Sequence, residues 1–283
     1  MLRLAIQSKG RLSDESTALL KEIGVSLDDS HRKFLLQAQG LPLELLYLRD
    51  DDIPQVVSDG TAALGIVGLN EVEERGLPVR IVKKLGFGNC RISLAVPKNA
   101  GYDGPQWFNG KRIATSYPNI LGKWLQENGI DAKVQVITGS VEVAPAAGIA
   151  DAIFDIVSSG GTLVANGLLE VEKVFGSEAV LISGKEIGEE GEGILKEMLF
   201  RIDSAQVSRG KKYLLMNIPT AAVDEAIRII PAMRSPTIMP LAAEGWCSMH
   251  SVVDEADLWD KVKLLKAIGA EGILVLNIDK IIP

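Results

Sequence analysis

The sequence is poor in aromatic residues, histidine and cysteine. Only 5% of its 283 residues are aromatic, which argues against the stacked rings of proteins that bind single-stranded nucleic acid. The two cysteines, Cys90 and Cys247, lie far apart, and the two histidines, His31 and His250, do not have the spacing of zinc ligands. We therefore expect neither a disulfide framework nor structural zinc, and we expect a cytoplasmic protein.

Long apolar runs and an excess of positive charge are also missing. No run approaches the ~18–20 apolar residues of a membrane span, and the first residues turn polar after Ile6, unlike a signal peptide. The net charge of −7 argues against a general nucleic-acid binder, so any anion site must be built locally. With 47% hydrophobic residues the chain can bury a full core, and we expect an enzyme of small molecules without membrane or nucleic-acid partners.

The first 88 residues predict alternating strands and helices. Residues 2–6 favour a strand, and the helix after them is predicted to have Ser13 as its N-cap and to end at Gly24. A second helix is indicated where three acids precede Pro54, and an apolar strand follows over residues 63–67. Because strands and helices alternate, we expect an α/β fold with a parallel sheet.

A second lobe of the same kind is predicted from residue 89 onward. Its expected strands and helix cover residues 92–96, 112–115, 118–129 and 133–137. We assign residues 1–88 with 184–205 to the first lobe and residues 89–183 to the second. Two such lobes facing each other would enclose a cleft, and open α/β sheets bind ligands at the carboxyl ends of their strands.

A third domain is predicted over residues 206–283. Residues 186–193 are rich in Gly and Glu without an apolar period, which indicates a connector, and a helical period resumes over residues 194–205. The expected order after the helix is strand, helix, strand, strand, helix, strand, over residues 213–218, 221–230, 237–241, 247–253, 255–268 and 273–278. This βαββαβ order is that of a ferredoxin-like domain.

The segment over residues 151–163 has the composition of an anion site. An apolar strand carries Asp155 and then enters the turn Ser158-Ser159-Gly160-Gly161-Thr162, which opens a helix. Glycines let backbone N–H groups approach a phosphate, hydroxyls add donors, and a helix N-terminus adds partial positive charge. The turn is also compatible with a plain strand-to-helix connection in which Thr162 is an N-cap. Asp155 favours a ligand, because a carboxylate between apolar neighbours is costly to bury without hydroxyls or a cation.

Two runs of this sequence form specific patterns, Gly139-Ser140-Val141-Glu142-Val143-Ala144-Pro145 and Asp155-Ile156-Val157-Ser158-Ser159-Gly160-Gly161-Thr162-Leu163. Less specific patterns are Lys9-Gly10-Arg11-Leu12, residues 59–68 and 91–97, and Ser235-Pro236-Thr237. Together these runs resemble the long form of ATP phosphoribosyltransferase, the first enzyme of histidine biosynthesis. The resemblance covers essentially the whole chain.

This resemblance implies a fold and a reaction. The fold is α/β, with two periplasmic-binding-protein-like lobes around a cleft and a C-terminal ferredoxin-like regulatory domain that binds histidine as a feedback inhibitor. The implied assembly is a homo-oligomer, a hexamer in equilibrium with dimers. In the implied reaction, N1 of the ATP adenine displaces pyrophosphate from C1 of phosphoribosyl pyrophosphate and gives phosphoribosyl-ATP. Mg²⁺ is the implied cofactor, bridging the pyrophosphate.

The resemblance also implies roles for residues of this chain. Glu142 and Asp155 are the expected catalytic residues, with Asp155 facing the ribose and Glu142 near the Mg²⁺-bound pyrophosphate. The expected binding residues for phosphoribosyl pyrophosphate are Asp151, Asp155, Ser158, Ser159, Gly160, Gly161 and Thr162. Those for ATP are Lys9, Arg11, Arg49 and Asn70, and those for the regulatory histidine are Asn217 and Thr237.

Some of these positions have a second interpretation. Asp151 could equally be a surface residue at a strand start, and Arg49 could form a salt bridge with one of the three acids that follow it. Many relatives carry a basic residue shortly after Pro145, where this chain has Ala146-Ala147, and an acid is also common at the position of Asn217.

A non-catalytic regulator is the alternative hypothesis. In that case the two lobes would sense a small molecule and the C-terminal domain an amino acid. The feature that favours the enzyme is the combination of Glu142, Asp155 and the Ser158–Thr162 turn, because a sensor does not need carboxylates for a ribose and a metal beside a phosphate turn.

Overall fold

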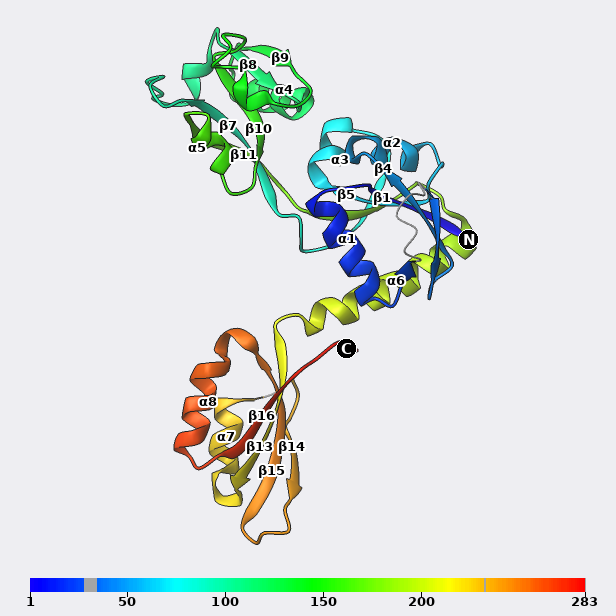
Figure 1. Cartoon of the computed structure of the whole chain (residues 1–283), viewed down its shortest axis with the longest axis vertical. Coiled ribbons are helices and arrows are strands. Elements are labelled where there is room, and N and C mark those ends of the chain that lie inside the picture. The colour runs from blue at the N-terminus through cyan, green and yellow to red at the C-terminus, as the bar shows by residue number, and fades with distance from the viewer. Residues whose placement is uncertain (28–34, 232, 283) are drawn as a thin grey trace. The chain divides into compact units, whose positions relative to one another are not determined.

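The computed structural model describes residues 1–27, 35–231 and 233–282, and the chain divides into two compact units, Met1–Ile194 and Leu195–Pro283. The first unit contains two sheets, each with its own helices, and the second contains one (Figure 1). The expected α/β fold with two lobes and a further domain is confirmed. His31 lies outside the described residues.

The first lobe is built on a seven-stranded sheet in the order β2-β3-β4-β1-β5-β12-β6. Its strands are β1 (Leu2–Gln7), β2 (Ser26–Leu27), β3 (Leu35–Gln39), β4 (Leu43–Leu48), β5 (Leu64–Gly68), β6 (Arg80–Lys84) and β12 (Ala179–Ser183). The helices α1 (Arg11–Glu22), α2 (Ile53–Ser58) and α3 (Leu69–Arg75) contact β1 or β5. Leu4, Ala5 and Ile6 have no exposed surface, so both faces of the central strand are covered.

The predicted parallel pairing is confirmed only in the middle of this sheet. β1 pairs in parallel with β4 and β5, whereas β12 pairs antiparallel with β5 and β6. All five residues of β12 are buried in these pairings. The expected boundary after residue 183 is therefore corrected, because residues 179–183 belong to the sheet of the first lobe.

The start of α1 also differs from its prediction. The helix begins at Arg11, with Gly10 as its N-cap, and the N–H of Asp14 donates to the Gly10 carbonyl at 3.1 Å. Ser13, the predicted N-cap, lies inside the first turn and is buried. The chain enters the helix directly from the turn after β1, so no side-chain cap is used.

The second lobe has a five-stranded sheet in the order β11-β7-β10-β8-β9. Its elements are β7 (Cys90–Pro97), β8 (Arg112–Thr115), α4 (Pro118–Glu127), β9 (Lys133–Val136), β10 (Ala152–Val157), α5 (Gly161–Ala165) and β11 (Leu168–Ser177). Phe108 and Phe154 are fully buried in its core. β10 lies between β7 and β8, so the turn after Val157 emerges from the middle of the sheet.

The predicted connector over residues 186–193 is wrong, because α6 (Gly188–Ser208) begins within it. Acidic residues lie in the first turn, where they favour the positive end of the helix dipole. Glu190 pairs with the N-terminal amine and Glu192 with Arg80 on β6. The first turns of α6 have no apolar period that would predict a helix. Their acidic side chains instead form ion pairs with residues far away in the sequence.

The second unit continues from α6 into a βαββαβ arrangement, as predicted. Its elements are β13 (Lys211–Pro219), α7 (Val223–Ile229), β14 (Thr237–Pro240), β15 (Trp246–Asp254), α8 (Leu258–Ala267) and β16 (Glu271–Asn277). The sheet is antiparallel in the order β14-β15-β13-β16, which is ferredoxin-like. Residues of α7 and α8 share one core with β13 and β15.

Candidate functional site

Two carboxylates lie close together near the carboxyl end of β10. Asp155 is on the strand beside Ser93 of β7, and Glu142 lies in the short 3₁₀ turn Val141–Val143, which packs on β10 through Val141. Burial, together with the charge of Glu142, raises the pKa of Asp155 to about 6, although the N–H of Ile156 donates to its Oδ1 at 2.8 Å. The structure therefore brings together the two residues that were expected to be catalytic.

The turn after β10 presents its backbone to solvent. Ser158, Ser159, Gly161 and Thr162 are exposed, and Gly160 has a left-handed φ of 81°. Gly160 is the N-cap of α5, so Thr162 lies within the helix and is not its N-cap. Because glycine has no side chain to cap the helix, the first backbone N–H groups of α5 are available to an anion.

Arg91, on β7, supports the start of this turn, a role that was not predicted from the sequence. Its Nη1 donates to the Ser158 carbonyl at 3.1 Å. The guanidinium is also paired with the carboxylate of Glu170 on β11, which accepts a bond from Ser93 as well. Strand pairing places these residues together, so spacing along the sequence gave no sign of them.

A pocket of about 260 Å³ is lined by residues of both lobes. Its lining combines cationic, amide, carboxylate and hydroxyl groups with small and apolar residues. The lining residues are Gln7, Arg11, Leu12, Asp50, Gly68, Asn70, Glu71, Gly88, Asn89, Cys90, Ile156 and Ser158. Arg11 and Asn70 were predicted to bind one substrate and Ser158 the other. The fold thus joins parts of both predicted binding sets around one space.

The other cations predicted to bind ATP lie outside this lining. Lys9 is exposed in the turn between β1 and α1, and Arg49 is largely exposed, with its Nε 3.2 Å from Asp51 Oδ1. The salt-bridge interpretation of Arg49 is therefore confirmed. Arg11 lines the pocket and also pairs with Glu15 one turn along α1.

Asp151 lies away from the turn, at the opposite end of β10. Its carboxylate accepts bonds from the backbone N–H of Arg112 at 2.8 Å and from the guanidinium of that residue at 3.2–3.3 Å. These bonds lower the pKa of Asp151. Asp155 lies four positions after Asp151, which is roughly 13 Å along a strand, so the structure does not bring the two together.

Asn70 belongs to a buried hydrogen-bond network. Its Nδ2 donates to Glu71 Oε1 at 2.8 Å and to the Tyr117 hydroxyl at 3.3 Å, and Ser177 Oγ donates to its Oδ1 at 2.8 Å. An ideal Cβ on Gly68 would be 2.4 Å from Asn70 Oδ1, so this side-chain position requires a glycine there. Asn70 lines the pocket, but its amide hydrogens are already used within the protein.

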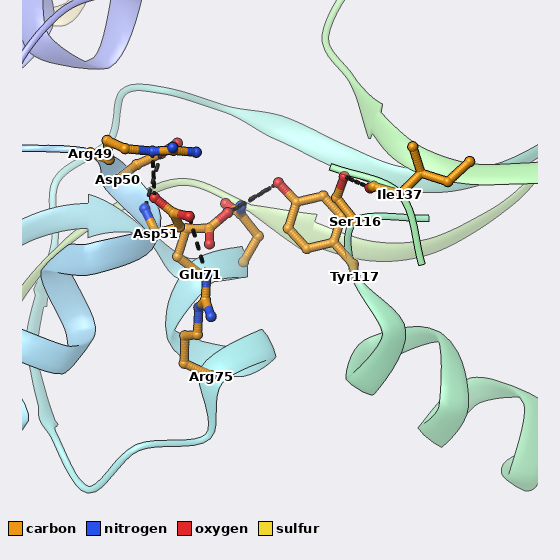
Figure 2. Close-up of polar contacts among 9 residues, drawn as sticks. Arg49, Asp50, Asp51, Glu71, Arg75, Ser116, Tyr117 and Ile137 are labelled. Atoms are coloured by element: carbon orange, nitrogen blue, oxygen red, sulfur yellow. Dashed lines mark hydrogen bonds and ion pairs between the residues drawn. The ribbon is translucent and has the colours of Figure 1, made fainter. Parts of the chain in front are cut away.

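Glu71 and Tyr117 form the part of this network that connects the lobes (Figure 2). The Tyr117 hydroxyl donates to Glu71 Oε1 at 3.0 Å, and both residues are buried. Burial and the nearby charge of Asp50 raise the pKa of Glu71 to about 7. Neither residue was predicted from the sequence, since they are 46 positions apart and share no motif.

A complete metal site is not formed by protein side chains alone. Within residues 1–27, 35–231 and 233–282, no three His, Cys, Asp or Glu side chains are placed to hold a metal ion together.

Among the helices of the same residues, none has the length and apolar character needed to cross a membrane.

In the second unit, the two residues expected to bind histidine lie on neighbouring parts of one sheet. Thr237 of β14 pairs with His250 of β15, and Asn217 of β13 pairs with Ser248 of β15. His250 bonds to Ser248 and to the hydroxyl of Tyr213. A pocket of about 620 Å³ in this unit is lined by neither Asn217 nor Thr237.

Comparison with known proteins gives concordant matches over the whole chain. The family model of ATP phosphoribosyltransferase matches residues 49–204, and that described as the HisG C-terminal domain matches residues 208–280. The ATP phosphoribosyltransferases of Bacteroides fragilis and Bacteroides thetaiotaomicron are 56% and 55% identical over 282 residues, which is 100% of this chain and of each relative.

Solved structures are similar to this chain over 72–73% of its length. The ATP phosphoribosyl transferase (HisG:HisZ) complex from Thermotoga maritima matches with a TM-score of 0.62 and 27% identity, covering 72% of this chain and 96% of that one. A substrate-binding protein of an amino acid ABC transporter matches with a TM-score of 0.51 and 12% identity, over 73% and 93% of the two chains. The second match shows a shared two-lobed fold only.

Proposed function

The chain belongs to the ATP phosphoribosyltransferase family, and we propose that its reaction takes place in the pocket between the two lobes. It is a pentosyl glycosyltransferase of histidine biosynthesis, with ATP and phosphoribosyl pyrophosphate as substrates. N1 of the adenine attacks C1 of the ribose, the bond from C1 to the pyrophosphate oxygen breaks, and pyrophosphate leaves with the bonding electrons.

This location of the reaction is supported by one observation: Arg11 and Ser158 line the same pocket. A displacement reaction requires both substrates at contact distance, and positioning of this kind supplies a large part of enzymatic rate enhancement. Arg11 comes from the helix after β1, whereas Ser158 begins the phosphate turn after β10. Each lobe thus contributes one candidate binding group for an anionic substrate.

On the second lobe, the turn from Ser158 to Thr162 would bind the 5′-phosphate of phosphoribosyl pyrophosphate. Its exposed hydroxyls and the uncapped start of α5 are donors for phosphate oxygens. Asp155, which directly precedes this turn, would face the ribose. As C1 loses the pyrophosphate it gains positive charge, and a carboxylate held in a partly buried position stabilises that charge more strongly than water does.

Glu142 and Asp155 also fit a role for Mg²⁺. Burial is the main cause of the raised pKa of Asp155, and the charge of Glu142 adds to it, so a divalent cation beside the two carboxylates would favour their ionised forms. Protein Mg²⁺ sites commonly use one or two carboxylates and complete their shell with substrate phosphates and water, which fits the lack of a third ligand in the described part of the chain. Glu142 would hold the ion, and the ion would neutralise charge on the departing pyrophosphate.

On the first lobe, Arg11 would contact the phosphates of ATP. Lys9 is exposed in the same turn and could extend a side chain to them, whereas Arg49 is already paired with Asp51. Asn70 would form part of the pocket wall, since both its amide hydrogens are bonded within the protein.

A pair of matched variants tests the site. Asp155→Asn, on β10, and Asp151→Asn, directly before β10, make the same chemical change, and the experiment measures phosphoribosyl-ATP formed from ATP, phosphoribosyl pyrophosphate and Mg²⁺. We expect turnover at least tenfold lower for Asp155→Asn and within twofold of the parent for Asp151→Asn, whose partner Arg112 lies at the far end of the strand. Equal loss in both variants would contradict the site.

Regulation and assembly are further parts of the proposal. Residues 206–283, with the ferredoxin-like order, would bind histidine as an inhibitor through Thr237 and Asn217, and the chain would assemble into dimers and hexamers. The two cysteines are free, which supports a cytoplasmic location. Sedimentation with and without histidine tests the assembly: we expect a shift toward one compact form, and an unchanged profile would contradict it.

A further inference from the structure

We propose that Glu71 and Tyr117 are positioning residues that hold the two lobes together beside the pocket, and that uptake of a proton by Glu71 strengthens this contact. The proposal rests on the proposed function, because it concerns the pocket in which both substrates would meet. It adds that protonation of Glu71 controls how far apart the two lobes hold their sides of the pocket.

The contact is made by buried polar groups from both lobes (Figure 2). Glu71, on α3 of the first lobe, accepts hydrogen bonds from the Tyr117 hydroxyl at 3.0 Å and from Asn70 Nδ2 at 2.8 Å. Tyr117 precedes α4 of the second lobe, and its hydroxyl also accepts from Asn70. Glu71 is 6% exposed and Tyr117 is 7% exposed, so separation of the lobes would bring water to both.

A second carboxylate of α3 contacts the same helix of the other lobe. Glu74 accepts backbone N–H bonds from Asn119 and Ile120, at 2.9–3.2 Å, and so caps the N-terminus of α4. Burial raises the pKa of Glu74, whereas the hydrogen bonds from Ile120 and Asn119 lower it. Within the described part of the chain, Glu71 accepts no backbone N–H bonds of this kind, and its pKa is raised to about 7, so we assign the proton uptake near neutral pH to Glu71.

Among the residues that the structure describes, the chain passes between the lobes twice, before β7 and after β11. Two lobes joined in this way around a ligand pocket can open and close as hinged bodies. The α3–α4 contact lies at that junction, so any opening that separates α3 from α4 breaks it. A change in the stability of this contact therefore changes the fraction of molecules in which the pocket walls are close.

The charged and titratable groups around Glu71 set the direction of the effect. Burial and the charges of Asp50 and Asp51 raise its pKa to about 7, whereas the Tyr117 hydroxyl and Arg75 lower it. The charge of Glu71 raises the pKa of the Cys90 thiol on β7, and the charge of Asp155 raises the pKa of Tyr117. When the contact opens, water returns the Glu71 pKa toward its ordinary value of 4.5, so opening releases a proton between pH 4.5 and about 7. The equilibrium constant for opening therefore increases about tenfold per pH unit in this window. Above the window it no longer depends on pH, because Glu71 is ionised in both forms.

The test measures lobe separation by energy transfer between two fluorescent labels without substrates. The labels are attached to cysteines introduced at Lys21 on α1 and Lys123 on α4, both exposed, in a chain carrying Cys90→Ser and Cys247→Ala. Labelled protein is diluted into unlabelled protein, so that transfer within an oligomer does not contribute. We expect the fraction with close lobes to fall as the pH rises from 5 to 7 and then to stay constant.

Four variants decide which group titrates. Glu71→Gln keeps an oxygen acceptor and cannot take up the proton, so the lobe separation of this variant should not change with pH. Asp155→Asn and Glu74→Gln should each keep the pH dependence of the parent, which excludes titration of the two other carboxylates with a raised pKa, one near the pocket and one in the α3–α4 contact. Tyr117→Phe removes the hydroxyl and should reduce the close fraction at every pH. A parent without pH dependence, or Glu71→Gln that retains it, would overturn the proposal. Failure to form phosphoribosyl-ATP would instead contradict the proposed function.

Discussion

Replacing Gly160 by alanine should weaken the binding of phosphoribosyl pyrophosphate much more than that of ATP. Gly160 has φ +81°, a left-handed conformation, at the point where the turn enters α5. An ideal Cβ there would meet only Val157 Cγ1, at 3.9 Å, which is an ordinary contact. The cost of the substitution is therefore in the backbone conformation and not in a steric clash.

The size of the effect follows from that conformation. An L-residue in the left-handed region costs about 1–2 kcal/mol relative to its preferred backbone. If the turn relaxes when no phosphate is bound, phosphate binding must restore the strained conformation, and this energy is lost from binding. Since 1.4 kcal/mol corresponds to a factor of ten, the KM for phosphoribosyl pyrophosphate should rise by about 5- to 30-fold. The KM for ATP should change by less than about twofold.

Gly167→Ala is the matched control for this experiment. Gly167 has φ +70° and nothing within 4 Å of an ideal Cβ, so the same strain is introduced just after α5 and away from the phosphate turn. The assay is initial-rate kinetics with each substrate varied in turn, together with the thermal unfolding midpoint of each variant. Similar loss of stability with a KM change only in Gly160→Ala would support the reasoning. Equal KM changes in both variants, or for both substrates, would refute it.

Four further predictions concern the site and its regulation. Glu142→Gln should lower kcat at least tenfold, about 1.4 kcal/mol in activation free energy, with no change in the unfolding midpoint. Because the pKa of Asp155 is raised from 3.8 to about 6, its ionised form destabilises the fold, so the midpoint of Asp155→Asn relative to the parent should increase as the pH rises from 4 to 6. Arg11→Gln should raise the KM for ATP at least fivefold, measured by initial rates; an effect on phosphoribosyl pyrophosphate alone would contradict its assignment. Thr237→Ala should need at least tenfold more histidine for half-inhibition of the rate, and unchanged inhibition would remove this residue from the regulatory site.

The sequence by itself determined the elements whose signals are local. The apolar run of β1, the strand β8 and the proline that opens α4 were all predicted within a residue or two. The six elements of the C-terminal βαββαβ order were also predicted, because each has its own apolar period and its own turn residues. The turn that connects β10 to α5 was predicted for the same reason, since glycines and hydroxyls after a strand form a contiguous pattern, and its binding of phosphate stays a prediction.

Tertiary structure decided the features that depend on residues far apart in the chain. β12 joins the first lobe through pairing with β5, more than one hundred residues earlier, and the first turns of α6 form ion pairs with Arg80 and the N-terminus. Asp151 and Asp155 are equivalent acids in the sequence, yet only Asp151 meets an arginine. Glu71 and Tyr117 carry no motif at all, and their contact exists because folding removes both from water and leaves each as the partner of the other. Hydrophobic periodicity can be read from neighbouring positions in the sequence. The pairing of buried polar groups depends on which segments the fold brings together.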